Sequence, residues 1–258
     1  MYPVLLSTGP LTVHTYGVFV ALGFLAGLAV TVFIARREGI ASGSIIDMGI
    51  LILAASLLGS RALYVLMNYS IYLNDPAGAI RIWEGGLVFS GGLVASVCAA
   101  AWYANSRGLP LRKTGDVWAP GIAIGQAIGR LGCFMAGCCH GRLALGYPWA
   151  VTFTDAACLA PTGIPLHPTQ LYSFVAGIAI FGILLSVSSF KKYDGQVLLW
   201  FVILHSTARL LVERYRGDFR GTVFGSSMTV TQLITLLMLT VAVAALFWTK
   251  NHDRKDGQ

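Results

Sequence analysis

Residues 121–141 read GIAIGQAIGRLGCFMAGCCHG, a stretch that sets a permanent charge among glycines. Gly121, Gly125 and Gly129 recur every four residues, and small residues at this spacing let a neighbouring membrane helix approach closely. Arg130 follows directly, although a charge at the centre of a bilayer costs roughly 2.5–3.5 kcal/mol. A cation in such an apolar, close-packed place suits an anionic lipid headgroup, and we expect Arg130 to bind one.

Two interpretations of Arg130 are open. Gln126 lies one turn before it on the same helix face. A guanidinium holds phosphate oxygens in a planar, bidentate arrangement that lysine cannot match, which favours phosphate binding. The alternative is a structural ion pair with another helix, with Glu213 as the partner.

The whole chain has the composition of a membrane protein. Of its 258 residues, 56% are hydrophobic and 11% are charged, whereas about a quarter of the residues of globular proteins are charged. Long apolar stretches alternate with short polar ones, so we expect one all-α polytopic membrane domain over residues 1–258. The net charge of +7 does not indicate nucleic-acid binding, because the basic residues lie in short loops.

Hydropathy predicts seven transmembrane helices, preceded by an interfacial arm at residues 1–14. The arm lacks the basic start of a cleaved signal peptide. The predicted helices cover residues 15–36, 45–68, 87–106, 117–138, 167–190, 195–213 and 228–249.

The basic residues at the helix ends and between the helices predict the orientation. Ten lysines and arginines lie on one side, counting Arg36 at the end of the first helix, and five lie on the opposite side. Because the cytoplasmic side carries the excess, we expect the N-terminus outside and the C-terminus in the cytoplasm. The loops at 69–86, 140–166 and 214–227 then lie outside. We expect 140–166, between helices 4 and 5, to form a small outer (periplasmic) cap with a short strand at 149–153.

A second polar site is predicted in the sixth helix. His205, Arg209 and Glu213 follow at intervals of four and so share one face, which should border a cavity rather than lipid. Glu213 is expected to pair with Arg209; the alternative to a functional site is that this pair only fixes the rotation of the helix. Arg61, near the outer end of the second helix, is expected to extend to the surface.

The segment before the third helix is rich in glycine. Residues 83–92 read WEGGLVFSGG and contain Gly85, Gly86 and Ser90. Glycines let the backbone approach a ligand or unwind locally. A turn followed by a tightly packed helix start is the competing explanation.

The fifth helix begins with the sequence HPTQLY, residues 167–172. Its proline suits the first turn of a helix. His167 and Gln170 either bind a headgroup or hydrogen-bond to the loop backbone.

The chain has five cysteines and no CxxC pair, so no standard zinc or thioredoxin pattern is present. They are Cys98, Cys133, Cys138, Cys139 and Cys158. Cys158 is close enough in sequence to bridge Cys138 or Cys139 in an oxidising compartment. We favour this disulfide over a metal site, which would need ligands such as His14, His167 or His205, and both over a catalytic thiol. We expect no metal and no cofactor.

Taken in order along the chain, these segments resemble the prolipoprotein diacylglyceryl transferase family. The family signature, G-R-x-G-N-F-x-N-x-E-x-x-G, is similar to residues 129–141, GRLGCFMAGCCHG. Further similarity lies in Tyr16–Gly17 and in residues 83–92, 167–172 and 209–216. The identical signature positions are Gly129, Arg130, Gly132, Phe134 and Gly141.

The resemblance implies a bacterial inner-membrane enzyme. It would transfer the diacylglyceryl group of phosphatidylglycerol to the lipobox cysteine thiol of a prolipoprotein and release glycerol-1-phosphate. The implied partners are phosphatidylglycerol, the signal peptides of prolipoproteins and the membrane. Functional roles are implied for Arg130 and Arg209, and for Glu213 after the latter. The residues expected to bind substrate are Tyr16, Gly85, Gly86, Ser90, Gln126, Gly129, His167, Gln170 and Glu213.

The chain departs from the family pattern at its polar positions. Ser90 stands in place of a histidine, and His205 in place of a tyrosine. In the signature, the two asparagines and the glutamate are replaced by Cys133, Ala136 and Cys138. The acid–base part of the site has therefore been rebuilt.

We accordingly expect four catalytic residues. Arg130 and Arg209 bind the phosphodiester, and His205 or His140 replaces the missing base. The alternative functions are a related lipid-headgroup transferase acting on another acceptor or lipid, an anionic-lipid-binding or transport protein, and a thiol-redox protein built on the cysteines.

Overall fold

The computed structural model describes residues 1–8, 11–73, 75–218 and 228–255. All seven helices expected from hydropathy are present, as α1, α2 and α4 to α8, with ends that differ by a few residues. Arg220, one of the five basic residues on the predicted outer side, falls outside the described residues. The elements in chain order are β1 (Val4–Thr8), β2 (Leu11–His14), α1 (Thr15–Arg37), α2 (Ser42–Met67), α3 (Tyr69–Tyr72), η1 (Pro76–Ile80), η2 (Ile82–Glu84), α4 (Phe89–Ser106), α5 (Leu111–Ala136), β3 (Val151–Thr152), β4 (Pro165–Leu166), α6 (Thr169–Ser189), α7 (Gln196–Glu213) and α8 (Val230–Lys255).

Within the described residues, five helices are long and apolar enough to cross a membrane: α1, α2, α6, α7 and the Val230–Thr249 part of α8. The predicted spans at α4 and α5 are helical, but they are not among these five. α5 carries Arg112, Lys113, Asp116 and Arg130, and such charges disfavour insertion in lipid. The five apolar helices give the chain the build of a multi-pass membrane protein.

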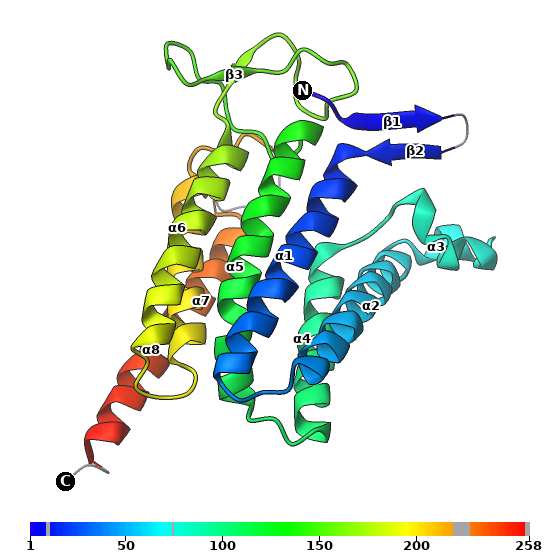
Figure 1. Ribbon diagram of the computed structural model, residues 1–258. Helices are drawn as coiled ribbons and strands as arrows, with labels where there is room; N and C mark the ends of the chain where they lie inside the picture. The colour runs from blue at the N-terminus through cyan, green and yellow to red at the C-terminus, as the bar shows by residue number, and fades with distance from the viewer. Residues whose placement is uncertain (9–10, 74, 219–227, 256–258) are drawn as a thin grey trace. The chain divides into compact units, whose positions relative to one another are not determined.

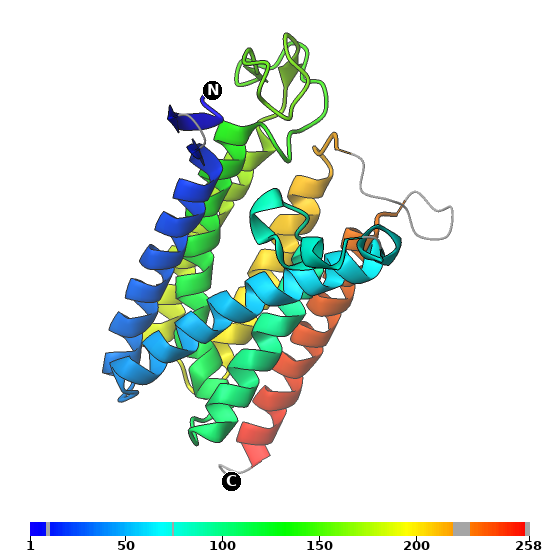
Figure 2. The ribbon, with the colours of Figure 1, turned by 90° about the vertical axis from the view of Figure 1, so that its right-hand side faces the viewer.

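The chain divides into two compact units, residues 1–31 with 115–258 and residues 32–114. In the first unit, α5 lies between α1 and α6 (Figure 1). α7 packs against both α6 and α8. The strands β1 and β2 and the 140–166 loop lie at one end of this unit, whereas α8 ends at the other (Figures 1 and 2).

Direct backbone contact joins α1 to α5. A Cβ atom added at Gly27 would lie 2.6 Å from the carbonyl oxygen of Gly121, and one at Gly23 would lie 2.6 Å from that of Gly125. No larger side chain fits at these positions unless the helices separate. The predicted packing role of Gly121 and Gly125 is confirmed, and their partners are the two glycines of α1.

A buried carboxylate ties α5 to the start of α7. Asp116 is 2% exposed and accepts hydrogen bonds from the backbone N–H groups of Gly195 at 2.8 Å and Leu198 at 2.9 Å. These donors lie at a helix N-terminus, where they lack intrahelical partners and where a negative charge is favourable. The apolar core of this unit lies among α5, α6 and α7 and contains Ala119, Ala123, Ile180, Leu184 and Val197.

The 140–166 loop has a small core of its own. β3 and β4 pair antiparallel, with Val151 opposite Leu166, so the strand expected at 149–153 is confirmed. Phe153 is completely buried and packs near Phe134 of α5. The first residues of the chain, expected as an arm, form a two-stranded hairpin of β1 and β2.

In the second unit, α2 and α4 pack through glycine. A Cβ atom at Gly59 would lie 2.7 Å from the carbonyl oxygen of Gly91. The tightly packed helix start proposed as the alternative for residues 83–92 is therefore present. Ser90 lies on the first turn of α4 and is exposed.

The expectation that Arg61 extends to the surface is wrong. Its residue is 6% exposed, and its guanidinium donates hydrogen bonds to the carbonyl oxygens of Gly78, Ala79, Gly85 and Gly86. Gly85 and Gly86 have φ values of +86° and +68°, a conformation in which glycine is favoured. The loop thus turns its carbonyl groups towards Arg61, which replaces the water they would otherwise bind.

The contact between α1 and α5 predicts that Gly27→Leu destabilises the protein, because the new side chain would have to occupy the space of the α5 backbone. Overpacking of this kind costs about 1–3 kcal/mol, measurable as a lower thermal unfolding temperature in detergent. The matched control is Gly182→Leu on α6, where an added Cβ meets nothing within 4 Å. Equal unfolding temperatures for the two variants would contradict the close contact.

Candidate active site

Arg130 of α5 and Arg209 of α7 line the same cavity. It lies between α5, α6 and α7 and has a volume of about 40 Å³, enough for a few water molecules. Gln126 and His205 line it too, so the structure brings four of the predicted site residues together. The other lining residues are Ala127, Ser173, Ala176, Gly177, Ile180, Ala208 and Val212.

Arg209 is held by the ion pair expected from its spacing. Its Nη1 atom lies 2.5 Å from Oε2 of Glu213, and the two side chains are 14% and 5% exposed. Thr229 Oγ1 donates a hydrogen bond of 3.3 Å to Oε1 of the same glutamate. Glu213 therefore fixes the guanidinium of Arg209 at the cavity.

Arg130 differs from Arg209 in this respect. Among the described residues, no carboxylate forms an ion pair with Arg130, and the alternative pair with Glu213 is not formed. The side chain is partly buried. Of the two arginines at the cavity, Arg130 is therefore the one without a carboxylate partner in the described part of the chain.

His205 lies one turn before Arg209 on α7. Its ring stacks on that of Phe201, with centroids 5.5 Å apart and an interplanar angle of 29°. Arg130 and Arg209 both interact electrostatically with the imidazole. The histidine thus lies beside both cations.

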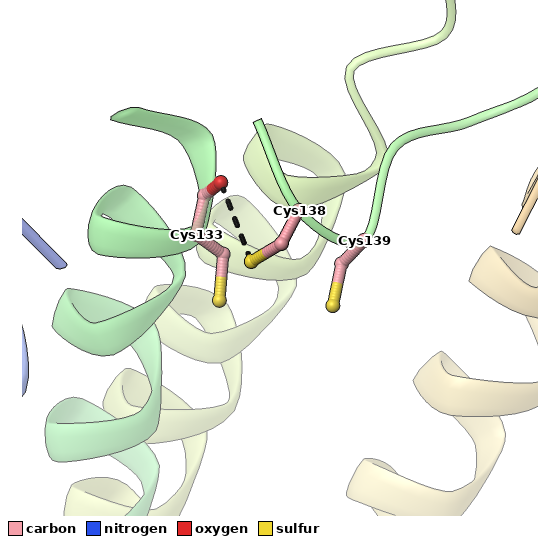
Figure 3. A group of neighbouring side chains, drawn as sticks. All are labelled: Cys133, Cys138 and Cys139. Carbon is pink, nitrogen blue, oxygen red and sulfur yellow. Dashed lines mark hydrogen bonds between the residues drawn. The ribbon is translucent and has the colours of Figure 1, made fainter. Parts of the chain in front are cut away.

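Three cysteine thiols meet where α5 ends. The Sγ atoms of Cys133, Cys138 and Cys139 all lie within 4.8 Å of one another. Figure 3 shows Cys133 on the helix and the other two on the chain that follows it. The thiol of Cys138 also contacts the carbonyl oxygen of Cys133, at 3.7 Å.

The disulfide favoured from the sequence is absent: none of the five cysteines, each within the described residues, is in a disulfide. Cys158 packs against Phe153 and its neighbours in the core of the 140–166 loop. It therefore does not join the other three thiols. Cys133 was not expected to join Cys138 and Cys139, because it lies on the preceding helix and comes close only where the chain turns back.

The turn that carries Cys138 and Cys139 is held by buried side chains of α6. Gly137, with φ of +73°, ends α5 in the manner of a C-terminal glycine. Thr169 Oγ1 donates to the carbonyl oxygen of Cys139 at 2.7 Å, and Gln170 Nε2 donates to that of Cys138 at 2.8 Å. Thr169 and Gln170 are 0% and 1% exposed. Gln170 thus satisfies loop backbone, the alternative proposed for it.

Arg216 belongs to this cluster and was missed as a site residue. Its guanidinium binds both carboxylate oxygens of Asp218 at 2.7 Å and also hydrogen-bonds to Cys139. Main-chain pairing of residues 140–142 with 215–217 brings it there, including a bond of 2.8 Å from Arg142 N to Tyr215 O. No local pattern in the sequence predicts such long-range pairing.

The contacts in the cluster favour ionisation of one thiol. The neighbouring thiols of Cys133 and Cys138, together with the guanidinium of Arg216, lower the pKa of the Cys139 thiol. These contacts favour the thiolate form of Cys139.

His140 and His167 do not line the cavity. His167 is 3% exposed, and its Nδ1 lies 3.0 Å from the hydroxyl group of Tyr172. Burial lowers the pKa of its imidazole, and the positive charge of Arg142 lowers it further. Nδ1 of His140 lies 3.1 Å from the carbonyl oxygen of Gly141.

The remaining predicted residues lie in three places. Tyr16, on the first turn of α1, is 45% exposed and interacts electrostatically with Cys133. Gly129 lies on α5, where an added Cβ would meet nothing within 4 Å. Gly85, Gly86 and Ser90 belong to the second unit.

Comparison with known proteins identifies the family. The sequence profile of the family described as prolipoprotein diacylglyceryl transferase matches residues 3–248. A Clostridium tetani protein named phosphatidylglycerol–prolipoprotein diacylglyceryl transferase is 30% identical over 243 residues, which cover 94% of this chain and 96% of that protein. Proteins of the same name from Vibrio atlanticus and Finegoldia magna are each 31% identical; the first match covers 95% of this chain and 90% of the relative, and the second covers 88% of each. The chain therefore belongs to the prolipoprotein diacylglyceryl transferase family.

Proposed function

We propose that this chain transfers the diacylglyceryl group of phosphatidylglycerol to the lipobox cysteine thiol of a prolipoprotein and releases glycerol-1-phosphate. Membership of the family supports this function, and so do the names of the relatives. The single observation that carries it is the cavity lined jointly by Arg130 and Arg209.

Two guanidinium groups beside one cavity suit a phosphodiester. Each can offer paired N–H donors to phosphate oxygens, and these charge-assisted hydrogen bonds are stronger than neutral ones. Glu213 orients Arg209, whereas Arg130 has no carboxylate partner among the described residues. We infer that the phosphate of the lipid is the negatively charged partner of Arg130.

The chemistry is a displacement at the glyceryl carbon that bears the phosphate. The acceptor sulfur forms a bond to this carbon while the carbon–oxygen bond breaks, and the electron pair leaves with glycerol-1-phosphate. Arg130 and Arg209 stabilise the charge that grows on the departing phosphate. Because Ser90 cannot act as a base, His205 or His140 accepts the proton of the thiol.

We propose roles for the remaining residues according to where they lie. Gln126, Gly129 and Glu213 act at or beside the cavity, and Tyr16 acts near the thiol cluster. Gln170 supports the loop that follows α5 through its hydrogen bond to the carbonyl oxygen of Cys138, and His167 does so through backbone hydrogen bonds with Gly141 and Arg142. Gly85, Gly86 and Ser90 contribute to substrate binding from the second unit.

The membrane setting is also proposed. Residues 1–258 form one membrane domain with seven spans, including α4 and α5, in the bacterial inner membrane. The N-terminus lies outside and the C-terminus in the cytoplasm, and the 140–166 loop forms a periplasmic cap. The distribution of basic residues supports this orientation, as does the placement of the hairpin and the end of α8 at opposite ends of the first unit (Figure 1).

The purified chain, supplied with phosphatidylglycerol and a lipobox peptide, should yield a thioether-linked peptide and one glycerol-1-phosphate per peptide. Arg130→Ala should lower the turnover rate about 10²–10³-fold, the usual effect of losing a donor to developing charge. Arg130→Lys should restore little, since lysine lacks the bidentate geometry. Mass spectrometry of both products measures the rate.

Arg112→Lys provides the control: it is the same substitution, made at an exposed residue, and should leave the rate unchanged. Full activity of Arg130→Lys would contradict bidentate phosphate binding. Transfer of an acyl chain in place of the diacylglyceryl group would contradict the proposed function itself.

His205→Ala should lower the turnover rate by roughly 10²–10⁴-fold, the range for a general base, and should flatten its dependence on pH. His14→Ala on the exposed strand β2 is the control. If His205→Ala and His140→Ala both keep the wild-type rate across the whole pH range, neither histidine is the base.

A further inference from the structure

We propose that Cys133, Cys138 and Cys139 together bind a zinc ion and leave one coordination position open for the acceptor's cysteine thiol. The inference rests on the proposed function, because it assigns the activation of the acceptor thiol to this ion. It concerns residues that stand where the family signature has other polar groups at 133 and 138. The site would thus be particular to chains with this thiol cluster.

The spacing of the sulfur atoms fits one ion. Zinc–sulfur bonds measure about 2.3 Å, which separates two sulfur ligands of a tetrahedral ion by about 3.8 Å. The three Sγ atoms lie within 4.8 Å of one another, so small side-chain rotations close the distance. Within the described part of the chain, no histidine, carboxylate or further cysteine joins the group. Three protein ligands and an open position characterise catalytic zinc sites rather than structural ones.

The backbone holds the thiols in place. Cys138 and Cys139 lie in the turn that follows α5, and Figure 3 shows their sulfur atoms both on the side of Cys133. Cys139 has a φ of +61°. This conformation costs a residue other than glycine about 1–2 kcal/mol, and strain of this kind is typical of functional sites. The buried Thr169 and Gln170 hold the turn.

The charges around the cluster suit thiolate ligands. Three thiolates and a divalent ion carry a net charge of about −1. Arg216 has a side chain only 4% exposed, hydrogen-bonds to Cys139 and is itself fixed by Asp218. A hydrogen bond from outside the ligand set orients a ligand and tunes the metal. The cluster therefore has a dedicated partner for its negative charge.

The position of the cluster connects it with the reaction. Cys133 follows Arg130 by three residues, about 4.5 Å along the helix axis, on a neighbouring part of the same face. An acceptor sulfur in the open position would thus lie next to the phosphate bound by Arg130. Thiols bind zinc as thiolates, so the acceptor gives up its proton on binding and His205 or His140 receives it.

The step is balanced without any oxidant or reductant. The bound thiolate attacks the glyceryl carbon, the carbon–oxygen bond to phosphate breaks, and the electron pair leaves with glycerol-1-phosphate. The product is a neutral thioether, a weaker ligand than a thiolate, and it leaves the ion. Zinc binding would lower the pKa of the acceptor thiol and so supply the thiolate without a strong base.

The first experiment measures metal in the full-length protein, purified in detergent without chelators. Elemental analysis should give one zinc per chain, and replacement by cobalt(II) should give a sulfur-to-cobalt charge-transfer absorption. Cys133→Ser and Cys138→Ser should each lower the affinity for zinc at least tenfold, whereas Cys158→Ser, outside the cluster, should keep it. Thermal unfolding checks that each variant folds, and the wild-type measurements do not depend on any variant.

The second experiment adds a lipobox peptide to the cobalt-loaded protein. A peptide with cysteine should strengthen the charge-transfer absorption, whereas the same peptide with serine should not. Arg130→Ala should lose transfer but keep both the metal and this response, which separates a failure of the proposed function from a failure of the metal site.

Four results would overturn the proposal. The first is a zinc content no higher than that of the Cys133→Ser/Cys138→Ser double variant, and the second is a disulfide between two of the three thiols in the active protein. The third is a bound metal whose absorption does not respond to the cysteine peptide. The fourth is full transfer activity in the metal-free protein. Copper(I) bound by all three thiols would also count against it, because a three-coordinate copper(I) ion has no position for the acceptor.

Discussion

The direct contact of the α1 and α5 backbones is the constraint on which the site depends. Gly23 and Gly27 face Gly125 and Gly121 so closely that no larger side chain fits. In a bilayer, where lipid is as apolar as the helices, close packing of this kind holds helices together. It fixes the rotation of α5, and through it the directions of Arg130 and Cys133.

Buried charge then defines the rest of the site. Asp116 binds the N-terminus of α7, and Glu213 holds Arg209 at the cavity. An unpaired buried charge is costly, and each of these carboxylates is matched with donors from the protein. Arg130 is not matched in this way within the described chain, which is the physical reason to expect an anionic ligand beside it.

Much of this could be predicted from the sequence, because it depends on local periodicity. Hydropathy located the helices, a spacing of four predicted the pair of Arg209 with Glu213, and the glycine spacing predicted the face of α5 that packs closely. What failed depended on residues far apart in the chain. Arg61 is buried because the loop at 76–86 folds back over it, and Cys158 lies in a small core to which Phe134 of α5 also contributes.

The thiol cluster shows the same limit at the site itself. Cys133 lies five residues before Cys138, but their proximity requires the turn at Gly137 and the buried donors of Thr169 and Gln170. Arg216 reaches Cys139 only because residues 215–217 pair with 140–142. Such contacts are tertiary and leave no periodic signal, so the sequence favoured a disulfide where the structure has a cluster of three thiols.

The central claim, that one phosphodiester is bound by Arg130 and Arg209 together, is tested most directly by a double-mutant cycle on lipid binding. The affinity for phosphatidylglycerol is measured by titration for the wild type, Arg130→Ala, Arg209→Ala and the double variant. If both guanidinium groups bind one phosphate, the second loss should cost less than the first, with a coupling of at least about 0.5 kcal/mol. Strictly additive losses would mean two independent contacts and would contradict the account.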